Sequence, residues 1–266
     1  MNKINVVDDV LKNVNVESDI EIEYIKKECL FAISEIKINI KESSTITINI
    51  KLKKDTKLNL NINIFEDVYT KINIITKGNT GKIQYKYNLT NNSNCDVFKF
   101  QNIDSIKEMV VVNLNDENAS LKYNFKTISN NKETYDYHIF HNSNNTSSII
   151  KNNGVCIADG SIIYQVSSFV PKKLKGCIVS QNNRIINLTN NKCEIRPNLY
   201  IDTKDVDAFH SALIGKFSDE EMFYMNSRGI DYDTANKLLI KGFLMSDISD
   251  SKMIKEIESN INKIWG

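Results

Sequence analysis

The sequence predicts a strand-rich, repetitive body followed by a small C-terminal helical domain. From about residue 18 to 205, apolar and polar residues alternate, which is typical of successive β-strands with one buried face. After about residue 218, the apolar spacing changes to that of helices. Hairpin turns are scarce, since only Asn153-Gly154 and Asp159-Gly160 qualify. The pattern fits a mainly β protein, either a β-sandwich or a β-solenoid, and favours the solenoid.

This change of period divides the chain into residues 1–17, 18–216 and 217–266. The first segment is short and polar, and a helix of this length is marginal by itself. It predicts at most a weak helix with four apolar residues on one face: Val6, Val7, Val10 and Leu11.

The body, residues 18–216, shows its alternation most clearly between residues 35 and 64. Strand starts recur about every 10–12 residues, and each coil of a solenoid would bury its apolar positions on the coil below. The 37 Asn residues fit either a biased coding sequence or Asn in repeated tight turns. The inward positions in this stretch form three runs: Ile36, Ile38 and Ile40; Ile46, Ile48, Ile50 and Leu52; Leu58, Leu60, Ile62 and Ile64.

The C-terminal segment, residues 217–266, predicts three helices. Ser218 and Glu221 form a capping box for the first helix, and Gly229 suits the position just after its end. Asp231 or Asp233 can begin a second helix, whose apolar residues are Ala235, Leu238, Leu239 and Phe243. A third helix over residues 250–264 would carry an apolar face made of Met253, Ile254, Ile257, Ile261 and Ile264.

The composition excludes several classes of protein. With 34 basic and 33 acidic residues among 266, the net charge of +1 argues against a nucleic-acid-binding protein. No run approaches the roughly 18 apolar residues of a membrane span. The first residues lack the basic and apolar regions of a secretory leader, so we expect a cytoplasmic protein with reduced thiols.

Motifs for enzyme chemistry are missing from the sequence. There is no Gly-x-Ser-x-Gly elbow, no Gly-rich phosphate loop and no His-Glu-x-x-His, so we expect no enzyme. Of the three His residues, His138 and His141 would point to opposite faces of one strand and therefore not share a metal ion. His210 would lie on a short strand just before the helices, where a structural role is the ordinary interpretation.

The five Cys residues form no Cys-x-x-Cys pair, so the sequence predicts no preformed zinc site. Cys29 and Cys156 stand in apolar surroundings and read as inert core residues. Cys193 has Lys192 and Arg196 nearby, which would favour a thiolate if they face it. Thiolates and imidazoles suit iron, iron–sulfur clusters and zinc, so three residues are candidate ligands: His210, Cys177 and Cys193.

The run from residue 196 to 245 combines several short motifs. They are a Pro-x-Leu strand, an Asp-Val-x-x-x-His segment, a Phe-Tyr-x-x-x-Arg-Gly-Ile turn and an Ala-x-x-x-Leu helix ending in Gly-Phe. This combination resembles the C-terminal signature of the SufB/SufD family of iron–sulfur cluster assembly scaffolds. Upstream, HNSNNTSSIIKNNGVCIADGSIIYQ is similar to a histidine-plus-Thr-Ser segment of the family. The motif residues here are Pro197, Leu199, Asp205, Val206, His210, Phe223, Tyr224, Arg228, Gly229, Ile230, Ala235, Leu239, Gly242 and Phe243.

The resemblance implies a right-handed parallel β-helix body with a C-terminal helical domain, acting as a scaffold. In this family two β-helix proteins pair, each docks a SufC-type ABC ATPase, and a cysteine desulfurase supplies sulfur indirectly. No cofactor would be tightly bound; iron or a nascent cluster would be held transiently, with His210 at the interface of the pair. The ATPase-docking residues, some of which equally fit the core of a helical hairpin, would be Phe223, Tyr224, Arg228, Gly229, Ala235, Leu239 and Phe243.

Departures from the family pattern indicate which member this chain is similar to. SufB has a Cys where this chain reads Asn-Asn-Arg at 182–184, and a Glu where it has Ser211. SufD usually has a Cys at the position of Ala208, so only His210 is retained of these candidate ligands. The pattern favours a SufD-like subunit that pairs with a SufB-like paralogue.

Two alternatives stay open. In the first, the chain pairs with itself as a standalone SufB-like scaffold and accepts sulfur on Cys177 or Cys193. In the second, it is a solenoid that binds carbohydrate or another surface; an export signal or an exposed aromatic ladder would favour that, and the sequence indicates neither.

Overall fold

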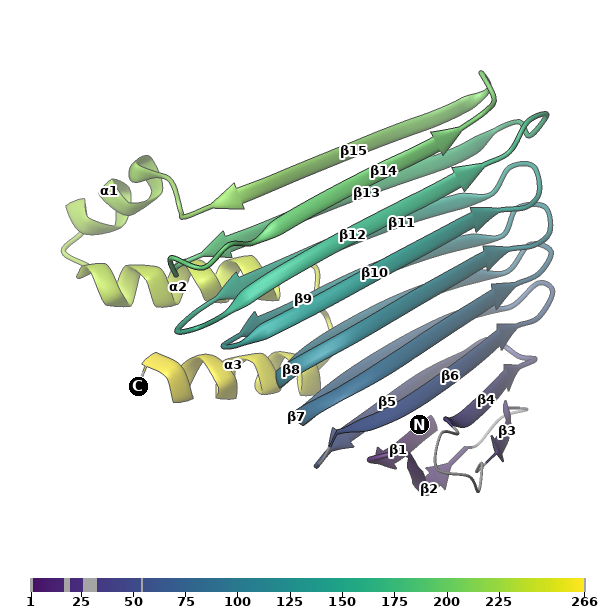
Figure 1. Ribbon diagram of the computed structural model, residues 1–266, viewed down its shortest axis with the longest axis horizontal. Coiled ribbons are helices and arrows are strands. Elements are labelled where there is room, and N and C mark those ends of the chain that lie inside the picture. Colours follow the sequence, from purple (N-terminus) through teal and green to yellow (C-terminus); the bar gives the residue numbers. More distant parts are fainter. Residues whose placement is uncertain (1, 17–19, 26–32, 54, 266) are drawn as a thin grey trace.

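The computed structural model describes residues 2–16, 20–25, 33–53 and 55–265, and Cys29 lies outside these ranges. Strands make up the body, and the helices that follow in the chain lie beside it (Figure 1). The helices in the described residues are α1 (Asp219–Ser227), α2 (Tyr232–Met245) and α3 (Ser251–Trp265). The strands are β1 (Asn2–Val7), β2 (Val10–Asn15), β3 (Ile20–Ile25), β4 (Ser34–Ile40), β5 (Ser44–Leu52), β6 (Thr56–Ile64), β7 (Tyr69–Leu89), β8 (Asn94–Leu114), β9 (Ser120–Ser129), β10 (Lys132–His141), β11 (Ser147–Cys156), β12 (Ser161–Val170), β13 (Cys177–Asn187), β14 (Glu194–Ile201) and β15 (Val206–Gly215).

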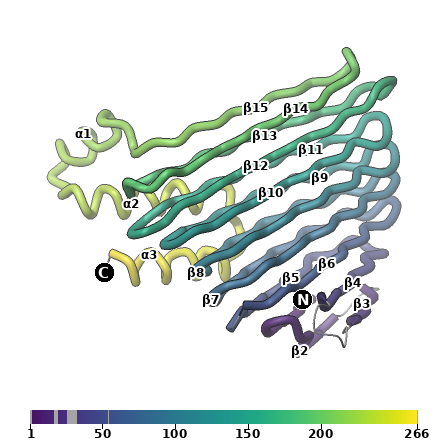
Figure 2. Tube along the Cα trace, viewed as in Figure 1, coloured from purple at the N-terminus to yellow at the C-terminus, as the bar shows by residue number. Residues whose placement is uncertain are grey.

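The strands form a parallel β-solenoid of about seven coils, so the solenoid prediction is confirmed and the sandwich alternative is wrong. Tyr69 pairs with Asn94, Asn94 with Ser120, and Ser120 with Ser147, each partner lying one coil further along the chain. Figure 2 shows these coils stacked in chain order, from the N-terminal strands to the helices. Each coil therefore buries its apolar residues against the coils that precede and follow it in the chain.

Each coil contributes one strand to each of two facing sheets. One sheet runs through β5, β9, β11, β13 and β15, and the other through β4, β6, β10, β12 and β14. The long strands β7 and β8 belong to both, because their first halves pair in one sheet and their second halves in the other. Gly78 lies where β7 passes between the sheets, with φ of +134°. A Cβ there would be 1.8 Å from the Leu52 carbonyl oxygen, which only glycine avoids.

The predicted weak helix over residues 1–17 is wrong, because this segment forms strands β1 and β2. β1 pairs in parallel with β5 and antiparallel with β2, and the chain reverses at Asp8, which has φ of 57°. Ile4 and Val6 alternate with polar residues and are buried in the main core. Pairing with the open edge of β5 outweighs the weak local preference for a helix.

One of the two expected hairpin signals does not mark a turn. Asp159-Gly160 lies between β11 and β12, but Asn153-Gly154 lies within β11. Asn153 is buried and donates a hydrogen bond to the Phe243 carbonyl oxygen on α2 at 3.3 Å. This contact with α2 holds Asn153 in the extended backbone of β11.

The turns between coils explain part of the Asn excess. Asp67, Asn92, Asn118 and Asn145 occupy successive turns and all have φ between 52° and 60°. Asn and Asp tolerate this left-handed conformation better than other residues with a Cβ. Their side chains also bond between coils, since Asn118 donates to Asn92 Oδ1 at 2.8 Å and Asn92 to Asp67 Oδ1 at 2.9 Å.

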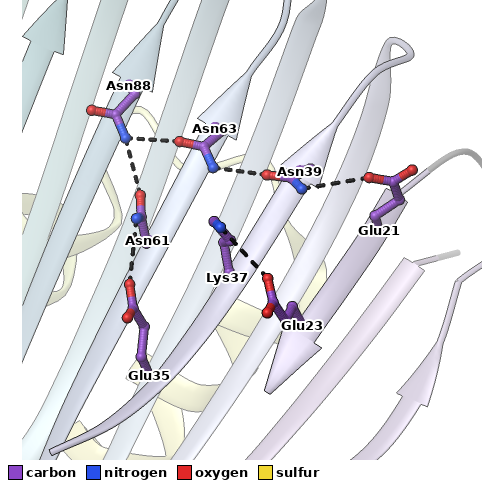
Figure 3. A network of polar contacts seen from close by, with 8 residues as sticks. All are labelled: Glu21, Glu23, Glu35, Lys37, Asn39, Asn61, Asn63 and Asn88. Atoms are coloured by element: carbon purple, nitrogen blue, oxygen red, sulfur yellow. Dashed lines mark hydrogen bonds and ion pairs between the residues drawn. The ribbon is translucent and has the colours of Figure 1, made fainter. Parts of the chain in front are cut away.

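A second set of amides lies in ladders on the outer face of the solenoid (Figure 3). Asn63 on β6 donates to Asn39 Oδ1 on β4 at 2.7 Å, and Asn88 on β7 donates to Asn63 Oδ1 at 2.8 Å. The same Asn88 amide reaches Asn61 Oδ1 at 3.0 Å. Parallel, in-register stacking places identical side chains next to each other, so one amide can satisfy the next.

The outer face also carries an aromatic ladder that the sequence reading missed. Phe140, Phe169 and Tyr200 come from β10, β12 and β14, with successive ring centroids 4.8 Å apart and planes within 11° of parallel. Tyr200, at the open end, is 54% exposed. The rings cover each other's faces and leave no row of flat platforms for sugar rings, so the ladder favours strand stacking over a carbohydrate-binding surface.

The three predicted helices are confirmed, together with the caps predicted for the first two. The Ser218 hydroxyl accepts from the Glu221 N–H at 3.2 Å, and the Glu221 carboxylate accepts from the Ser218 N–H at 2.8 Å. Gly229 follows α1 with φ of 79°, and Asp231 caps α2 by accepting from the Thr234 N–H at 2.9 Å. None of the helices in the described residues is long and apolar enough to cross a membrane.

The helices pack along one sheet of the solenoid. A second apolar cluster joins Ala235, Ile240 and Leu244 of α2 and Met253, Ile257 and Ile261 of α3 to outward residues of that sheet: Ile75, Phe100, Ile128, Val155 and Ile186. Polar contacts flank this cluster, including Lys77–Glu256 at 2.5 Å and Lys71 to Ser249 Oγ at 2.9 Å. The helices therefore rest on the solenoid through both apolar and polar contacts.

Candidate functional site

The C-terminal end of the solenoid is open. Strand β15 pairs with β13 and ends the sheet, and β14 ends the other sheet by pairing with β12. His210 lies in the middle of β15, in register with Gln181, and its side chain is exposed. Within the described residues its imidazole makes no hydrogen bond, and its role as a ligand stays a prediction.

Large apolar side chains are exposed on both faces of the strand that carries His210. Phe209 is 58% exposed and Leu213 is 54% exposed, although both stand on a β-strand. Tyr200 of β14 and Ile214 are also exposed. An exposed strand edge with exposed apolar side chains is a typical site for pairing with another chain.

Cys177 is placed differently from His210. Its side chain is buried at the start of β13, and its sulfur lies 3.5 Å from Thr146 Oγ1 and 3.6 Å from the Ser143 carbonyl oxygen. It packs with Val170 and Val179 in a small apolar cluster. A buried thiol with these partners meets solvent only if the coil opens, and its role stays a prediction.

Cys193 lies close to a second cysteine, which the sequence reading treated as inert. The Cys193 and Cys156 sulfur atoms are 3.3 Å apart. The hydrogen bond between the two sulfur atoms, and to a lesser extent the Ile162 backbone N–H, lowers the pKa of Cys193 to about 6. Arg196 is not the cause, because its guanidinium is bound to Glu194, with Nε 2.6 Å from the carboxylate.

The residues predicted to dock an ATPase fall into two groups. Phe223 and Tyr224 of α1 are 73% and 58% exposed, and Arg228 lies 4.9 Å from the centre of the Tyr224 ring. Ala235 is fully buried in α2. Leu239 and Phe243 are partly buried against the second apolar cluster, so α1 provides the accessible surface and α2 mostly supports it.

Charged residues inside the solenoid form a network that the sequence reading missed. Lys99 and Glu108, both on β8, make an ion pair with no exposure of either side chain. Nearby, Glu133 accepts hydrogen bonds from Tyr135 at 2.7 Å and Thr127 at 2.9 Å, and burial raises its pKa to about 8. The missed signal was parity, because Glu133 shares the inward alternation of Tyr135 and its neighbours.

The two histidines of β10 point to opposite faces, as predicted. His141 is buried, with its Nδ1 2.8 Å from Thr146 Oγ1 and its Nε2 2.8 Å from Ser148 Oγ. Burial lowers the pKa of His141 to about 4. His138 lies outside, 3.1 Å from Asp136. His141 is therefore a neutral structural residue, and no group of three or more His, Cys, Asp or Glu side chains in the described ranges could hold a metal ion.

Comparison of the sequence with protein families finds a known domain. The family model described as "SUF system FeS cluster assembly, SufBD core domain" matches residues 24–243, which is most of the chain. The chain belongs to the SufBD family. The match runs from β3 through the solenoid to α2 and so includes His210, the four described cysteines and the exposed face of α1.

Individual SufBD proteins are similar over shorter stretches. The iron–sulfur cluster assembly SufBD family protein of Mycobacterium leprae is 44% identical over 69 residues, covering 25% of this chain and 18% of that protein. That of Pyrococcus horikoshii is 30% identical over 107 residues, covering 40% and 22%. That of Staphylococcus haemolyticus is 26% identical over 123 residues, covering 46% and 26%. The matched parts thus span about a quarter or less of the length of these SufBD relatives.

Proposed function

We propose that this SufBD family chain is a non-catalytic, SufD-like scaffold subunit for iron–sulfur cluster assembly in the cytoplasm. It pairs with a SufB-like partner through its last coil and docks a SufC-type ABC ATPase through its helices. The observation that carries the proposal is the open end of the solenoid, where His210 and exposed apolar residues share one strand edge.

Pairing at β15 would satisfy both the backbone and the side chains of this end. A strand from the partner would bond to the unpaired edge of β15, while Phe209 and Leu213 would lose their contact with water. His210 would then lie between two subunits, where its imidazole can bind nascent iron or a cluster as cargo.

Docking of an ATPase would use the exposed side of α1. Phe223 and Tyr224 project from this helix and Tyr232 from the start of α2, and all three are more than half exposed. If the helices of the two paired subunits each bind one ATPase, closure of the two ATPases would shift the paired last coils and expose the interface between these coils. Such coupling requires an element with two arrangements whose balance depends on nucleotide.

Co-expression with a SufB-like protein and an ABC ATPase of the same genome tests the pairing. We expect a complex of all three by size-exclusion chromatography with light scattering. Leu213→Asp places a charge in the proposed interface, so the SufB-like protein should be lost while the ATPase stays bound. Met109→Asp, at an exposed apolar residue on β8, is the matched control and should keep both partners. Retention of the SufB-like protein by Leu213→Asp would overturn the pairing.

The role of His210 is tested in the same complex. His210→Ala should leave the complex intact and lower the yield of cluster, measured by its visible absorbance after addition of iron, cysteine and a cysteine desulfurase. An undiminished yield would remove His210 from the site.

A standalone SufB-like homodimer that accepts sulfur is the second candidate, and the partly exposed Cys193 with its lowered pKa favours it. The chain alone would then be a dimer and would gain a persulfide on Cys193 from a cysteine desulfurase. A monomer without persulfide would favour the SufD-like assignment.

A further inference from the structure

Two cysteines from different coils meet near the C-terminal end of the solenoid. Cys156 is the last residue of β11, and Cys193 directly precedes β14, 37 residues later. Their sulfur atoms lie 3.3 Å apart, within the range of a thiol hydrogen bond. A disulfide requires about 2.05 Å, so the sulfurs need to approach by only about 1.2 Å.

The two thiols differ in their access to solvent. Cys156 is fully buried in the main core, whereas Cys193 is partly exposed at its surface. The hydrogen bond shared by the two sulfur atoms lowers the pKa of Cys193 and raises that of Cys156. One sulfur is thus an accessible nucleophile and the other a protected partner beside it.

The turn that carries Cys193 is held against the preceding coil. Ser161 Oγ donates to the Lys192 carbonyl oxygen at 2.7 Å, and Thr189 Oγ1 donates to the Gly160 carbonyl oxygen at 3.3 Å. Within the turn, the Thr189 N–H donates to Asn187 Oδ1, and the Thr189 hydroxyl shares its proton between that oxygen and the Gly160 carbonyl. These bonds keep the two sulfurs together before any reaction, so little chain entropy is lost when they join.

We propose that Cys156 and Cys193 form a thiol–disulfide exchange site that reacts with low-molecular-weight disulfides of the glutathione type. The Cys193 thiolate attacks one sulfur of the small disulfide and releases one small thiolate, leaving a mixed disulfide on Cys193. The Cys156 thiol then loses its proton and attacks Cys193 Sγ, releasing the second small thiolate. The protein loses two electrons and two protons, and the small disulfide is reduced to two thiols.

This site does not depend on the proposed pairing or on ATPase docking. It involves neither His210 nor α1, and it ties β11 to the turn before β14 by a covalent bond. Cys95 and Cys177 are buried without a neighbouring thiol among their hydrogen-bond partners, so they serve as internal controls.

Intact-mass and peptide mass spectrometry of the folded chain with oxidised glutathione tests the proposal. All versions carry Cys29→Ser, so that only Cys95, Cys156, Cys177 and Cys193 can react. We expect the otherwise unchanged chain to form the Cys156–Cys193 disulfide and to return to two thiols with reduced glutathione. Cys156→Ser should stop at one glutathione on Cys193. Cys193→Ser should react at least about tenfold more slowly at pH 7, because of the pair it keeps only the buried Cys156 thiol. Cys156→Ala checks that a hydroxyl in the core does not cause the change.

Two results would overturn the site. One is a folded chain that gains glutathione but no Cys156–Cys193 disulfide at any ratio of oxidised to reduced glutathione. The other is modification of Cys95 or Cys177 as fast as that of Cys193. Circular dichroism of each variant before the reaction separates both results from loss of the fold.

Discussion

Lys99 and Glu108 form an ion pair inside the solenoid, although both residues belong to the same strand, β8. Lys99 Nζ also lies 4.4 Å from the centre of the Tyr85 ring and 5.1 Å from that of Phe125. Because neither charge reaches water, Glu108→Gln should leave an uncompensated buried ammonium group. We expect it to lower the free energy of unfolding by about 3–5 kcal/mol, measured by urea titration.

The double variant Lys99→Met, Glu108→Gln is the control for this pair. It removes both charges and keeps similar volumes, so it should recover most of the stability that the single variant loses. If the double variant is as unstable as Glu108→Gln alone, volume and shape matter here and the ion pair does not.

Glu133 should make stability fall as pH rises. Burial raises the pKa of Glu133 to about 8 in the folded chain, against 4.5 for an ordinary Glu. Between these two pH values the Glu133 carboxyl is therefore protonated in the folded chain and ionised in the unfolded chain. Stability then decreases across this interval, by up to about 1.4 kcal/mol per pH unit. Glu133→Gln cannot ionise but can still accept from Tyr135 and Thr127, so it should remove this dependence.

The clean interval for this measurement is pH 6.5 to 8. The lowered pKa of His141, about 4, makes its contribution rise with pH only below about 6.5, so it is constant here. Cys193, with a pKa of about 6, contributes stability that rises with pH above 6, but equally in both proteins. The stability of wild type relative to Glu133→Gln should fall by roughly 2 kcal/mol over this interval. A constant difference would mean that Glu133 is already ionised.

The sequence was sufficient for the solenoid and the helices because their signals are local and repeated. Alternation alone identified the inward residues of β4 to β6, and Ser218 with Glu221 identified the start of α1. Residues 1–17 were misjudged because β1 exists through its pairing with β5, more than thirty residues away. Local spacing in such a short segment carries no information about that edge.

The candidate site was predictable only in part. Motifs indicated His210 and α1 as candidates, whose roles stay predictions, and strand parity could have placed Glu133 inside. The contact between Cys156 and Cys193 depends on the length of the turn between β13 and β14, which no periodicity reveals. The sequence also suggested the wrong cause for the lowered pKa of Cys193, which is due to Cys156 and not to Arg196, its neighbour in sequence.

The Asn turn ladder gives a prediction about stability. Asn118 has φ of 59° and donates to Asn92 Oδ1 at 2.8 Å, so Asn118→Ala loses the hydrogen bond and strains the backbone. We expect it to cost about 2 kcal/mol in urea unfolding. Asn118→Gly keeps the left-handed conformation and loses only the bond, so it should cost clearly less. Equal losses would assign the effect to the hydrogen bond alone.

The exposed aromatic residues of α1 give a prediction that rests on the proposed ATPase docking. Phe223 is 73% exposed, so its replacement by Ser should change the free energy of unfolding by no more than about 0.5 kcal/mol. If Phe223 enters a pocket of the ATPase, the same change should weaken binding by about 2 kcal/mol, or roughly thirtyfold, in calorimetry.

Met222 is the matched control, because it precedes Phe223 on the same helix but is buried in the second apolar cluster. Met222→Ala should lower the free energy of unfolding, by about 2 kcal/mol or more, with a smaller effect on ATPase binding as long as the chain is folded. Opposite responses of these two neighbours separate a docking surface from packing of the helix itself. If Phe223→Ser binds the ATPase as well as wild type does, the docking surface does not include this side of α1.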